Sequence, residues 1–214
     1  MSPHRRGTLV VISAPSGTGK STLARRLIES VPELAFSVSH TTRPRRAGEE
    51  SGREYHFVDD ARFDAMVAAG EFLEWAHVFA HRYGTAREGI AAALDAGTDV
   101  LLDIDVQGAR QVRASGLGAV LVFVLPPDYD TLSDRLRRRG SEDSGALSLR
   151  LQEARGEAMQ YDAFDYVVVN ADLEEATAEL AAIVRAERAR TGRRREDVSR
   201  ILSTFPAPLR GATE

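Results

Sequence analysis

The apolar positions of this chain follow two alternating patterns. Short continuous apolar runs predict buried β-strands, and the segments between them repeat apolar residues every three or four positions, which predicts helices. The runs lie at 8–13, 100–104, 119–125 and 166–170, and the helical patterns at 21–30, 86–96, 107–114, 128–138 and 173–190. Because continuous apolar strands alternating with helices are typical of a parallel sheet covered on both faces, we expect an α/β fold.

A middle segment interrupts this rhythm. Short extended pieces are expected at 36–41, 55–58, 72–78 and 81–85, with one helix from Asp59 or Asp60 to Ala68. We interpret 39–85 as an insertion that carries a second substrate. The expected organisation is a single domain over 1–214, with a core at 8–38 and 86–190, the insertion at 39–85, a lid at about 138–155 and a disordered tail at 204–214.

Composition narrows the class of protein. The 214 residues are 43% hydrophobic and 28% charged, which is typical of a soluble globular protein. The net charge of −4 argues against general affinity for nucleic acid. The absence of cysteine excludes disulfides and fits a reducing compartment. With neither a signal-peptide pattern nor an apolar stretch of membrane-spanning length, we expect a cytoplasmic protein that does not bind membranes.

The first predicted strand leads into a glycine-rich loop and then a helix. This loop matches the phosphate-binding pattern G-x-x-x-x-G-K-[ST], except that Ala14 replaces the first glycine, where alanine fits only with a negative φ. In such a loop Lys20 reaches the outer phosphates and the Ser21 hydroxyl holds Mg²⁺. The alternative is an ordinary glycine-rich turn, but the order of strand, loop and helix favours a nucleoside triphosphate site. That site comprises Ala14, Pro15, Ser16, Gly17, Thr18, Gly19, Lys20, Ser21 and Thr22.

An arginine-rich stretch opens the insertion. Arg43 and Arg46 offer planar forks for a phosphate, and Tyr55 adds a hydroxyl. A solvated basic loop, balanced by Glu49 and Glu50, is the alternative, and composition alone favours it.

Acidic residues end one of the buried strands. Asp103 and Asp105 are two positions apart, so they share a face at the edge where parallel sheets bind ligands. We assign Asp103 to the environment of Mg²⁺ and Asp105 to the nucleotide, although Asp105 could instead cap the next helix. Further along, a flexible turn flanked by Arg135, Arg138, Arg139 and Arg150 could close over a triphosphate, or form a charged helix face.

Four motifs together resemble guanylate kinases. They are residues 37–57, 71–76 (EFLEWA), 83–85 (YGT) and 103–108 (DIDVQG), and the resemblance runs in order from Leu9 to about Arg188. It implies a P-loop kinase fold with an inserted monophosphate-binding subdomain and a lid. It also implies transfer of the γ-phosphoryl group of ATP to GMP with Mg²⁺, giving ADP and GDP. The small-molecule substrates would then be ATP and GMP.

The resemblance also assigns roles to residues. For GMP it implies Ser39, Arg43, Arg46, Glu49, Tyr55, Glu74, Tyr83, Thr85 and Asp105, and for ATP it adds Arg135 and Asn170 to the loop. As catalytic residues we expect Lys20, with the lid arginines Arg139 and Arg150 that the resemblance implies, to stabilise the transferred group, and Arg43 to hold the acceptor in line. Since the attacking atom is already a phosphate oxyanion, no general base is required, and positioning and electrostatics dominate.

The chemistry of Glu74 agrees independently with a guanine site. Guanine presents N1–H and N2–H₂ side by side, which one carboxylate can accept, whereas adenine would leave a buried carboxylate unpaired. Such a site can reject the wrong base by on the order of 10⁴-fold. An exposed acid beside Trp75 is the alternative.

The chain departs from the family pattern at three places. Arg45 stands where the family usually has proline, so either Arg45 or Arg46 could take the phosphate, and the spacing to residues 48–49 favours Arg46. Ala80 replaces a common glycine, and Ala171 a common aspartate after Asn170.

Two alternative functions remain. One is a kinase with a different acceptor, and the other is a binding module rather than an enzyme. Another P-loop kinase, such as one acting on a ribose bisphosphate, would have no use for Glu74. A docking module that has lost catalysis should lack a working phosphate loop, yet Gly17, Gly19, Lys20 and Ser21 stand together here.

Overall fold

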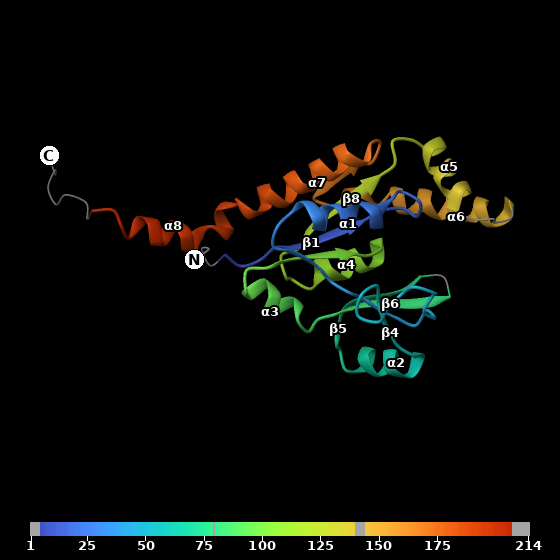
Figure 1. Cartoon of the computed structure of the whole chain (residues 1–214), viewed down its shortest axis with the longest axis horizontal. Coiled ribbons are helices and arrows are strands. Elements are labelled where there is room, and N and C mark those ends of the chain that lie inside the picture. Colours follow the sequence, from blue (N-terminus) through green and yellow to red (C-terminus); the bar gives the residue numbers. More distant parts are fainter. Residues whose placement is uncertain (1–4, 79, 140–143, 207–214) are drawn as a thin grey trace.

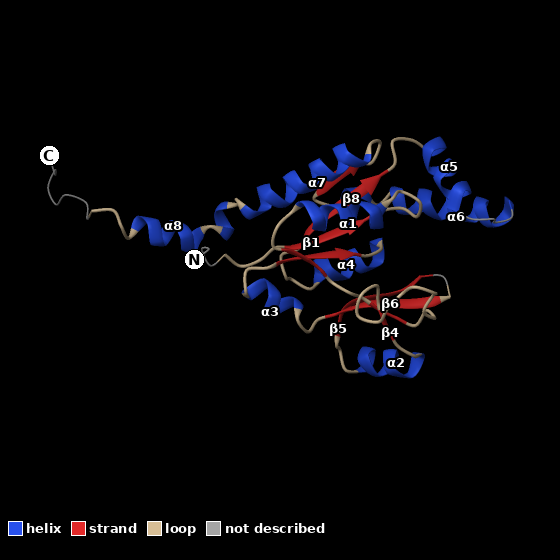
Figure 2. Ribbon diagram, viewed as in Figure 1, coloured by secondary structure: helices blue, strands red, loops and turns tan. Residues whose placement is uncertain are grey.

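The larger of two sheets forms the centre of the molecule (Figures 1 and 2). The structure is a computed structural model that describes residues 5–78, 80–139 and 144–206. Five strands, all pairing in parallel, lie in the order β2-β7-β1-β8-β9. Their bounds are β1 Leu9–Ser13, β2 Leu34–Phe36, β7 Asp99–Asp103, β8 Val120–Leu125 and β9 Tyr166–Val169. The expected α/β fold with a parallel sheet is confirmed.

Helices cover both faces of this sheet, as the continuous apolar runs predict. Within β1, Val10 and Ile12 join a core cluster with helices α1 and α7, whereas Leu9 and Val11 join a second cluster with helices α3 and α4. The bounds are α1 Lys20–Ser30, α3 Ile90–Asp95, α4 Val106–Ala114 and α7 Leu173–Arg188. All five residues of β1 are buried, and Leu9 to Ile12 form an unbroken apolar run rather than alternating with polar residues.

The smaller sheet lies beside the larger one, with α4 between them (Figure 2). Its strands follow the order β4-β3-β6-β5, in which only β3 and β4 are parallel. They are β3 His40–Thr41, β4 His56–Phe57, β5 Phe72–Val78 and β6 His81–Ala86, and helix α2 (Asp60–Ala68) packs on them through Phe63 and Met66. The expected insertion at 39–85 includes the residues of this sheet except Ala86, the last residue of β6, and the division into core and insertion stays a prediction.

The remaining helices follow β8 and β9. They are α5 Tyr129–Arg139, α6 Ser144–Ala158 and α8 Arg195–Leu202, with short 3₁₀ helices at Tyr161–Ala163 and Thr191–Arg193. Helix α8 extends from the end of α7, away from both sheets (Figure 1). Among the described residues, no helix combines the length and apolar character needed to cross a membrane.

Three expectations about elements need correction. The segment 36–41 is not one strand, because β2 belongs to the larger sheet and β3 to the smaller one. The helix expected from residue 86 begins at Ile90, since Ala86 still pairs with Phe72 in the sheet. Helix α8 is absent from the prediction, and α6 is expected only as the helix, without bounds, that follows the turn at 140–145. Of the tail expected at 204–214, residues 207–214 lie outside the described residues.

Candidate functional site

The glycine-rich loop lies between β1 and α1. Gly17 (φ 89°) and Gly19 (φ 97°) are left-handed, which explains why glycine occupies both positions. Ala14 is not among the described residues with positive φ, so the replacement of the first glycine strains nothing. The loop therefore keeps the backbone form that points N–H groups at an anion in front of α1.

Arg135 and Asn170 support the loop from behind. The Thr18 carbonyl accepts hydrogen bonds from Arg135 Nη1 (3.1 Å) and Asn170 Nδ2 (2.8 Å), and Arg135 Nη2 donates to the Asn170 carbonyl (3.0 Å). Asn170 is buried, and neither side chain lines the cavities described below. In this structure both residues brace the loop backbone.

Lys20, at the first position of α1, reaches the end of β7. Its Nζ lies 2.5 Å from Asp103 Oδ1 and donates to the Ile104 carbonyl at 2.7 Å. The Ser21 hydroxyl is on an exposed residue that lines the same cavity as Asp103. Hydroxyl and carboxylate oxygens suit Mg²⁺, so Ser21 and Asp103 fit that ion chemically. Within the described residues, no group of three or more His, Cys, Asp or Glu side chains could hold a metal alone.

Two cavities adjoin at Lys20. One, of about 650 Å³, is lined by residues 14–21 of the loop and by Glu153 and Glu157 of α6. The other, of about 380 Å³, is lined by residues that include Ser39, Tyr55, Glu74, Tyr83 and Asp103. Ser16, Lys20, Ser21, Val78 and Asp105 line both. Two ligands bound in these cavities would thus meet at the ammonium group of Lys20.

Glu157 is a residue of this site that the sequence did not indicate. The Ser16 N–H donates to Glu157 Oε2 at 3.2 Å, so a carboxylate from α6 contacts the anion-binding loop. Burial raises the pKa of Glu157, and the Ser16 hydrogen bond opposes this shift. A triphosphate would compete for that N–H. The two residues are 141 positions apart, and no local pattern links them.

Glu74 lies in the wall of the smaller cavity. It is 4% exposed, so the alternative of an exposed acid is wrong. The pKa of Glu74 is raised to about 7, chiefly by burial and also by the charge of nearby Asp105, although hydrogen bonds from Thr85 and the charge of Lys20 act to lower it. Ser39 Oγ lies 3.4 Å from Thr85 Oγ1, so Ser39, Glu74 and Thr85 form one polar group.

Asp105 caps a helix and also faces the cavities. It is the N-cap of α4, where its side chain accepts the Gly108 N–H at 2.8 Å. It also lines both cavities. The capping alternative is therefore confirmed without excluding a contact with a nucleotide.

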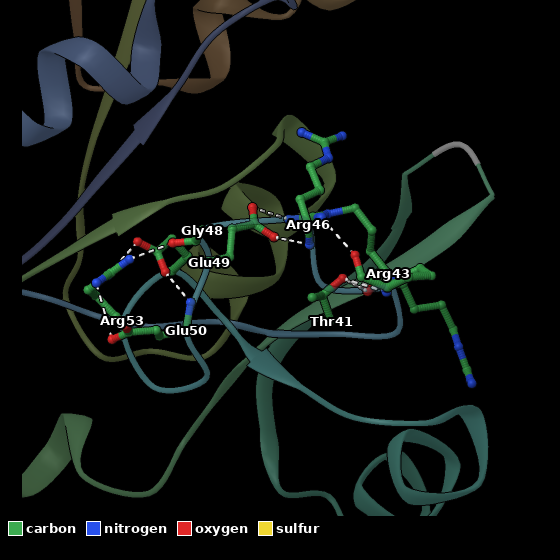
Figure 3. Close-up of polar contacts among 10 residues, drawn as sticks. Thr41, Arg43, Arg46, Gly48, Glu49, Glu50 and Arg53 are labelled. Atoms are coloured by element: carbon green, nitrogen blue, oxygen red, sulfur yellow. Dashed lines mark hydrogen bonds and ion pairs between the residues drawn. The ribbon is translucent and has the colours of Figure 1, made fainter.

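The arginine-rich loop folds around Glu49 (Figure 3). The Arg43 guanidinium and the Glu49 carboxylate face each other, with Nη2 and Oε1 at 2.8 Å, and the Arg46 N–H donates to Glu49 Oε2 at 2.8 Å. Arg43 is buried, with its Cζ 5.4 Å from the centre of the Tyr55 ring. A solvated loop is therefore the wrong description for Arg43, whereas Arg45 and Arg46 are exposed.

The remaining sequence-predicted residues are placed only in part. The Tyr55 and Tyr83 rings lie 5.7 Å apart at an edge angle and line the smaller cavity. Arg150 is half-buried in α6. Arg139 ends α5, but its side chain lies outside the described part of the chain, as do residues 140–143 of the expected lid.

Comparisons with known proteins bear on this site. The family model described as guanylate kinase matches residues 6–187. A guanylate kinase of Rhodopseudomonas palustris (strain BisB5) is 50% identical over 185 residues, which cover 86% of this chain and 84% of the relative. One of Neisseria gonorrhoeae is 49% identical over 193 residues, 90% and 94% of the two chains. The crystal structure of guanylate kinase from Anaplasma phagocytophilum is similar with a TM-score of 0.76 and 35% identity, over 93% and 97% of the two chains.

Proposed function

The chain belongs to the guanylate kinase family, and on this premise we propose that its two adjoining cavities hold ATP and GMP. The protein transfers the γ-phosphoryl group of ATP to GMP, which gives ADP and GDP, a step of purine nucleotide metabolism. The observation that carries the assignment of the cavities is that they meet at Lys20, where a phosphoryl group would pass between the substrates.

The larger cavity holds ATP. Residues 14–22 present backbone N–H groups and the N-terminus of α1 to the phosphates. Lys20 exchanges Asp103 for the outer phosphates, because a polyphosphate carries more negative charge than one carboxylate. Arg135 and Asn170 contribute by holding the Thr18 carbonyl, and thus the loop, in place.

The smaller cavity holds GMP. Ionised Glu74 accepts N1–H and N2–H₂ of guanine, while Ser39, Thr85 and Asp105 complete the polar wall. Adenine would set its unprotonated N1 against the carboxylate and leave a buried charge unpaired. The hydrogen-bond acceptors that line the smaller cavity therefore select guanine over adenine.

The acceptor phosphate lies between the arginine-rich loop and the tyrosines. Arg43, Arg46, Tyr55 and Tyr83 supply donors to it. Glu49 takes part through Arg43, since its carboxylate holds that guanidinium and the Arg46 backbone in one loop conformation. A direct contact between Glu49 and a phosphate would set two negative charges together.

The reaction needs charge compensation rather than a proton acceptor. Ser21 and Asp103 are the residues that would hold Mg²⁺, which neutralises charge on the β- and γ-phosphates when bound. Lys20, together with Arg139 and Arg150 of the expected lid, stabilises charge on the transferred group, while Arg43 keeps the acceptor in line. Because its substrates are cellular nucleotides and it carries no cysteine, we place the protein in the cytoplasm.

The test is the variant Glu74→Gln, which keeps the size of the side chain and removes one of its two acceptors. We expect KM for GMP to rise by roughly 10- to 100-fold and the preference for GMP over AMP to fall, with KM for ATP unchanged. The matched control is Glu71→Gln, three residues earlier, where the carboxylate is exposed and pairs with Arg62. An unchanged preference between the two acceptors would remove Glu74 from its assigned role.

A further inference from the structure

A β-bulge turns Glu74 toward the larger sheet. In the β5–β6 pair, Phe72 lies opposite Ala86 and Glu74 opposite Thr85, so Leu73 is an extra residue on β5. Regular alternation would put Phe72 and Glu74 on one face. Instead Phe72 and Trp75 both contact Phe63 of α2, with ring centres 4.6 and 6.2 Å away. Leu73 packs with Ala109 and Val112 of α4.

The carboxylate of Glu74 lies against a glycine in the first turn of α4. A Cβ atom added to Gly108 would come within 2.4 Å of Glu74 Oε2, far closer than atoms can approach. Gly108 lies within the helix and is not among the glycines with positive φ, so its backbone conformation does not require glycine. Glycine is required instead by the lack of space beside it, because any side chain at position 108 would displace the carboxylate of Glu74.

One turn further along α4, Gln111 holds the strand next to Glu74. The side-chain amide of Gln111 accepts the Trp75 N–H at Oε1 (3.2 Å) and donates from Nε2 to the Trp75 carbonyl (2.7 Å). Strand β5 is at the edge of its sheet, so these backbone groups face no neighbouring strand. Gln111 supplies both hydrogen bonds that such a strand would have made.

We propose that Gln111 and Gly108 are positioning residues of the guanine site, which hold the bulged strand and leave room so that Glu74 faces the base. The proposal rests on the proposed role of Glu74 in binding guanine and extends it to α4. Gln111 fixes the backbone directly after Glu74, and Gly108 fixes how near the carboxylate comes to the helix. Neither residue is among those that line the two cavities.

The first test is Gln111→Leu, which keeps the approximate shape and removes both hydrogen bonds. We expect KM for GMP to rise about 10-fold, with kcat and KM for ATP within about 2-fold of the parent. The preference for GMP over inosine monophosphate, whose base lacks the 2-amino group, should fall, because a displaced carboxylate loses its second hydrogen bond. Arg110→Leu, at the adjacent exposed position of α4, is the matched control and should leave all four quantities unchanged.

A double-mutant cycle separates positioning from a general structural role. If Gln111 acts through Glu74, then Gln111→Leu should raise KM for GMP by less than about 2-fold in a Glu74→Gln background. An equal rise in both backgrounds would overturn the proposal while leaving the guanine role of Glu74 intact. If Glu74→Gln itself leaves KM for GMP unchanged, the proposed function of Glu74 fails, and the positioning proposal fails with it.

The second test is Gly108→Ala. We expect KM for GMP to rise about 10-fold while the melting temperature stays the same or rises, because alanine favours helix more than glycine does. In a Glu74→Ala background the added methyl group no longer meets the Glu74 carboxylate, and the nearest remaining atom is Asp105 Oδ1 at 3.3 Å, so any further rise should stay below about 2-fold. Parent-like KM for GMP in Gly108→Ala would contradict the close approach of Glu74.

Discussion

The residues of this site act mainly through the charges of their side chains, which are buried or half-buried around the two cavities. Lys20 pairs with Asp103 and Arg43 with Glu49, whereas Glu74 is buried beside the hydroxyl and N–H of Thr85, with the charges of Asp105 and Lys20 acting on it in opposite directions. The first two pairs are balanced, so each can be opened by a phosphate that offers more charge than a carboxylate. Glu74 has no such balance, and its ionisation state therefore decides what it can bind.

The raised pKa of Glu74 gives GMP binding a pH dependence. Since the pKa is raised to about 7 and the ionised form accepts both guanine donors, KM for GMP should rise as the pH falls below about 7. KM for ATP should change little over the same range. The measurement is KM for GMP from pH 5.5 to 8.5 in the parent and in Glu74→Gln. The variant keeps the titration of the GMP phosphate, so identical profiles would show that Glu74 is not the titrating group.

The same shift has a consequence for stability. A carboxyl group whose pKa rises on folding stabilises the folded state below its unfolded pKa near 4.5, and this contribution is lost as the pH rises through about 7. Glu74→Gln should therefore raise the free energy of unfolding at pH 8.5, by up to about 3 kcal/mol, and change it little at pH 4.5. Urea unfolding at the two pH values measures the difference, and an equal effect at both would refute the shift.

Lys20 should be needed for turnover rather than for GMP binding. Lys20→Met removes the cation at the junction of the two cavities, so we expect kcat to fall at least about 10²-fold. Calorimetry should still show GMP binding near the parent affinity, because Glu74 and the arginine-rich loop remain. Arg25→Met, an exposed position of the same helix, serves as control. Parent-like turnover in Lys20→Met would exclude the assigned role.

The sequence could indicate a functional residue only where that residue belongs to a short, recognisable motif. Lys20 and Arg43 lie in motifs where residue type and spacing already suggest phosphate binding, and Glu74 belongs to a local family motif. Glu157 and Gln111 act through partners 141 and 36 positions away, and an isolated Glu or Gln on a helix has no distinguishing pattern. Their roles depend on contacts that only the folded chain brings together.

At the scale of elements, the phosphate loop depends on the helix packed behind it. A Cβ atom at Gly17 would lie 2.8 Å from Leu136 of α5, and the φ of 89° there disfavours any side chain. Two constraints therefore fix the loop at Gly17, namely its left-handed backbone conformation and its contact with Leu136 of α5. Its alignment with the larger cavity depends on both.

Gly17→Ala should weaken ATP binding selectively. The added methyl group must push the loop away from α5, so we expect KM for ATP to rise at least about 10-fold with KM for GMP unchanged. Gly116→Ala provides the control, since φ is also positive there (73°) but no atom lies within 4 Å of the added Cβ. The control should lose roughly 1–2 kcal/mol of stability without a change in KM for ATP. Equal KM values for ATP in the two variants would contradict this account.

Element boundaries were harder to predict than element types. The buried strands and the helices between them follow from periodicity, because burial on both faces forces continuous apolar sequence. The segment 36–41 carries the same β-branched, alternating signal throughout, yet the chain leaves one sheet at Phe36 and enters the other at His40. The bulge at Leu73 likewise leaves no mark in the pattern of Phe72–Val78. Pairing across strands decides both features.

At the scale of the whole molecule, a buried ion cluster ties three distant parts together. Asp99, at the start of β7, accepts from Arg5 (2.6 and 3.0 Å), from Arg188 at the end of α7 (2.6 Å) and from the Thr8 N–H (2.6 Å). Burial raises the pKa of this carboxyl group, but the two arginines and the N–H lower it by more, so it stays ionised. The cluster lies at the end of the sheet away from the phosphate loop.

Removing Asp99 should destabilise the fold without changing substrate preference. Asp99→Ala leaves Arg5 and Arg188 with little exposure and no carboxylate, so we expect a loss of roughly 3–5 kcal/mol. Asp95→Ala removes the exposed pair with Arg6 and should cost less than about 1 kcal/mol. Chemical denaturation measures the free energy of unfolding of both variants. Similar losses would mean that the buried cluster stabilises the fold no more than an exposed ion pair does.

The most direct test of the central claim is an acceptor panel with the unmodified protein. ADP release from ATP and Mg²⁺ would be measured with GMP, AMP, CMP, UMP, dTMP and ribose 1,5-bisphosphate as acceptors. The account predicts turnover with GMP and a value of kcat/KM for AMP lower by on the order of 10⁴-fold. Comparable turnover with AMP or with the base-free acceptor, or no turnover with any acceptor despite ATP binding, would contradict it.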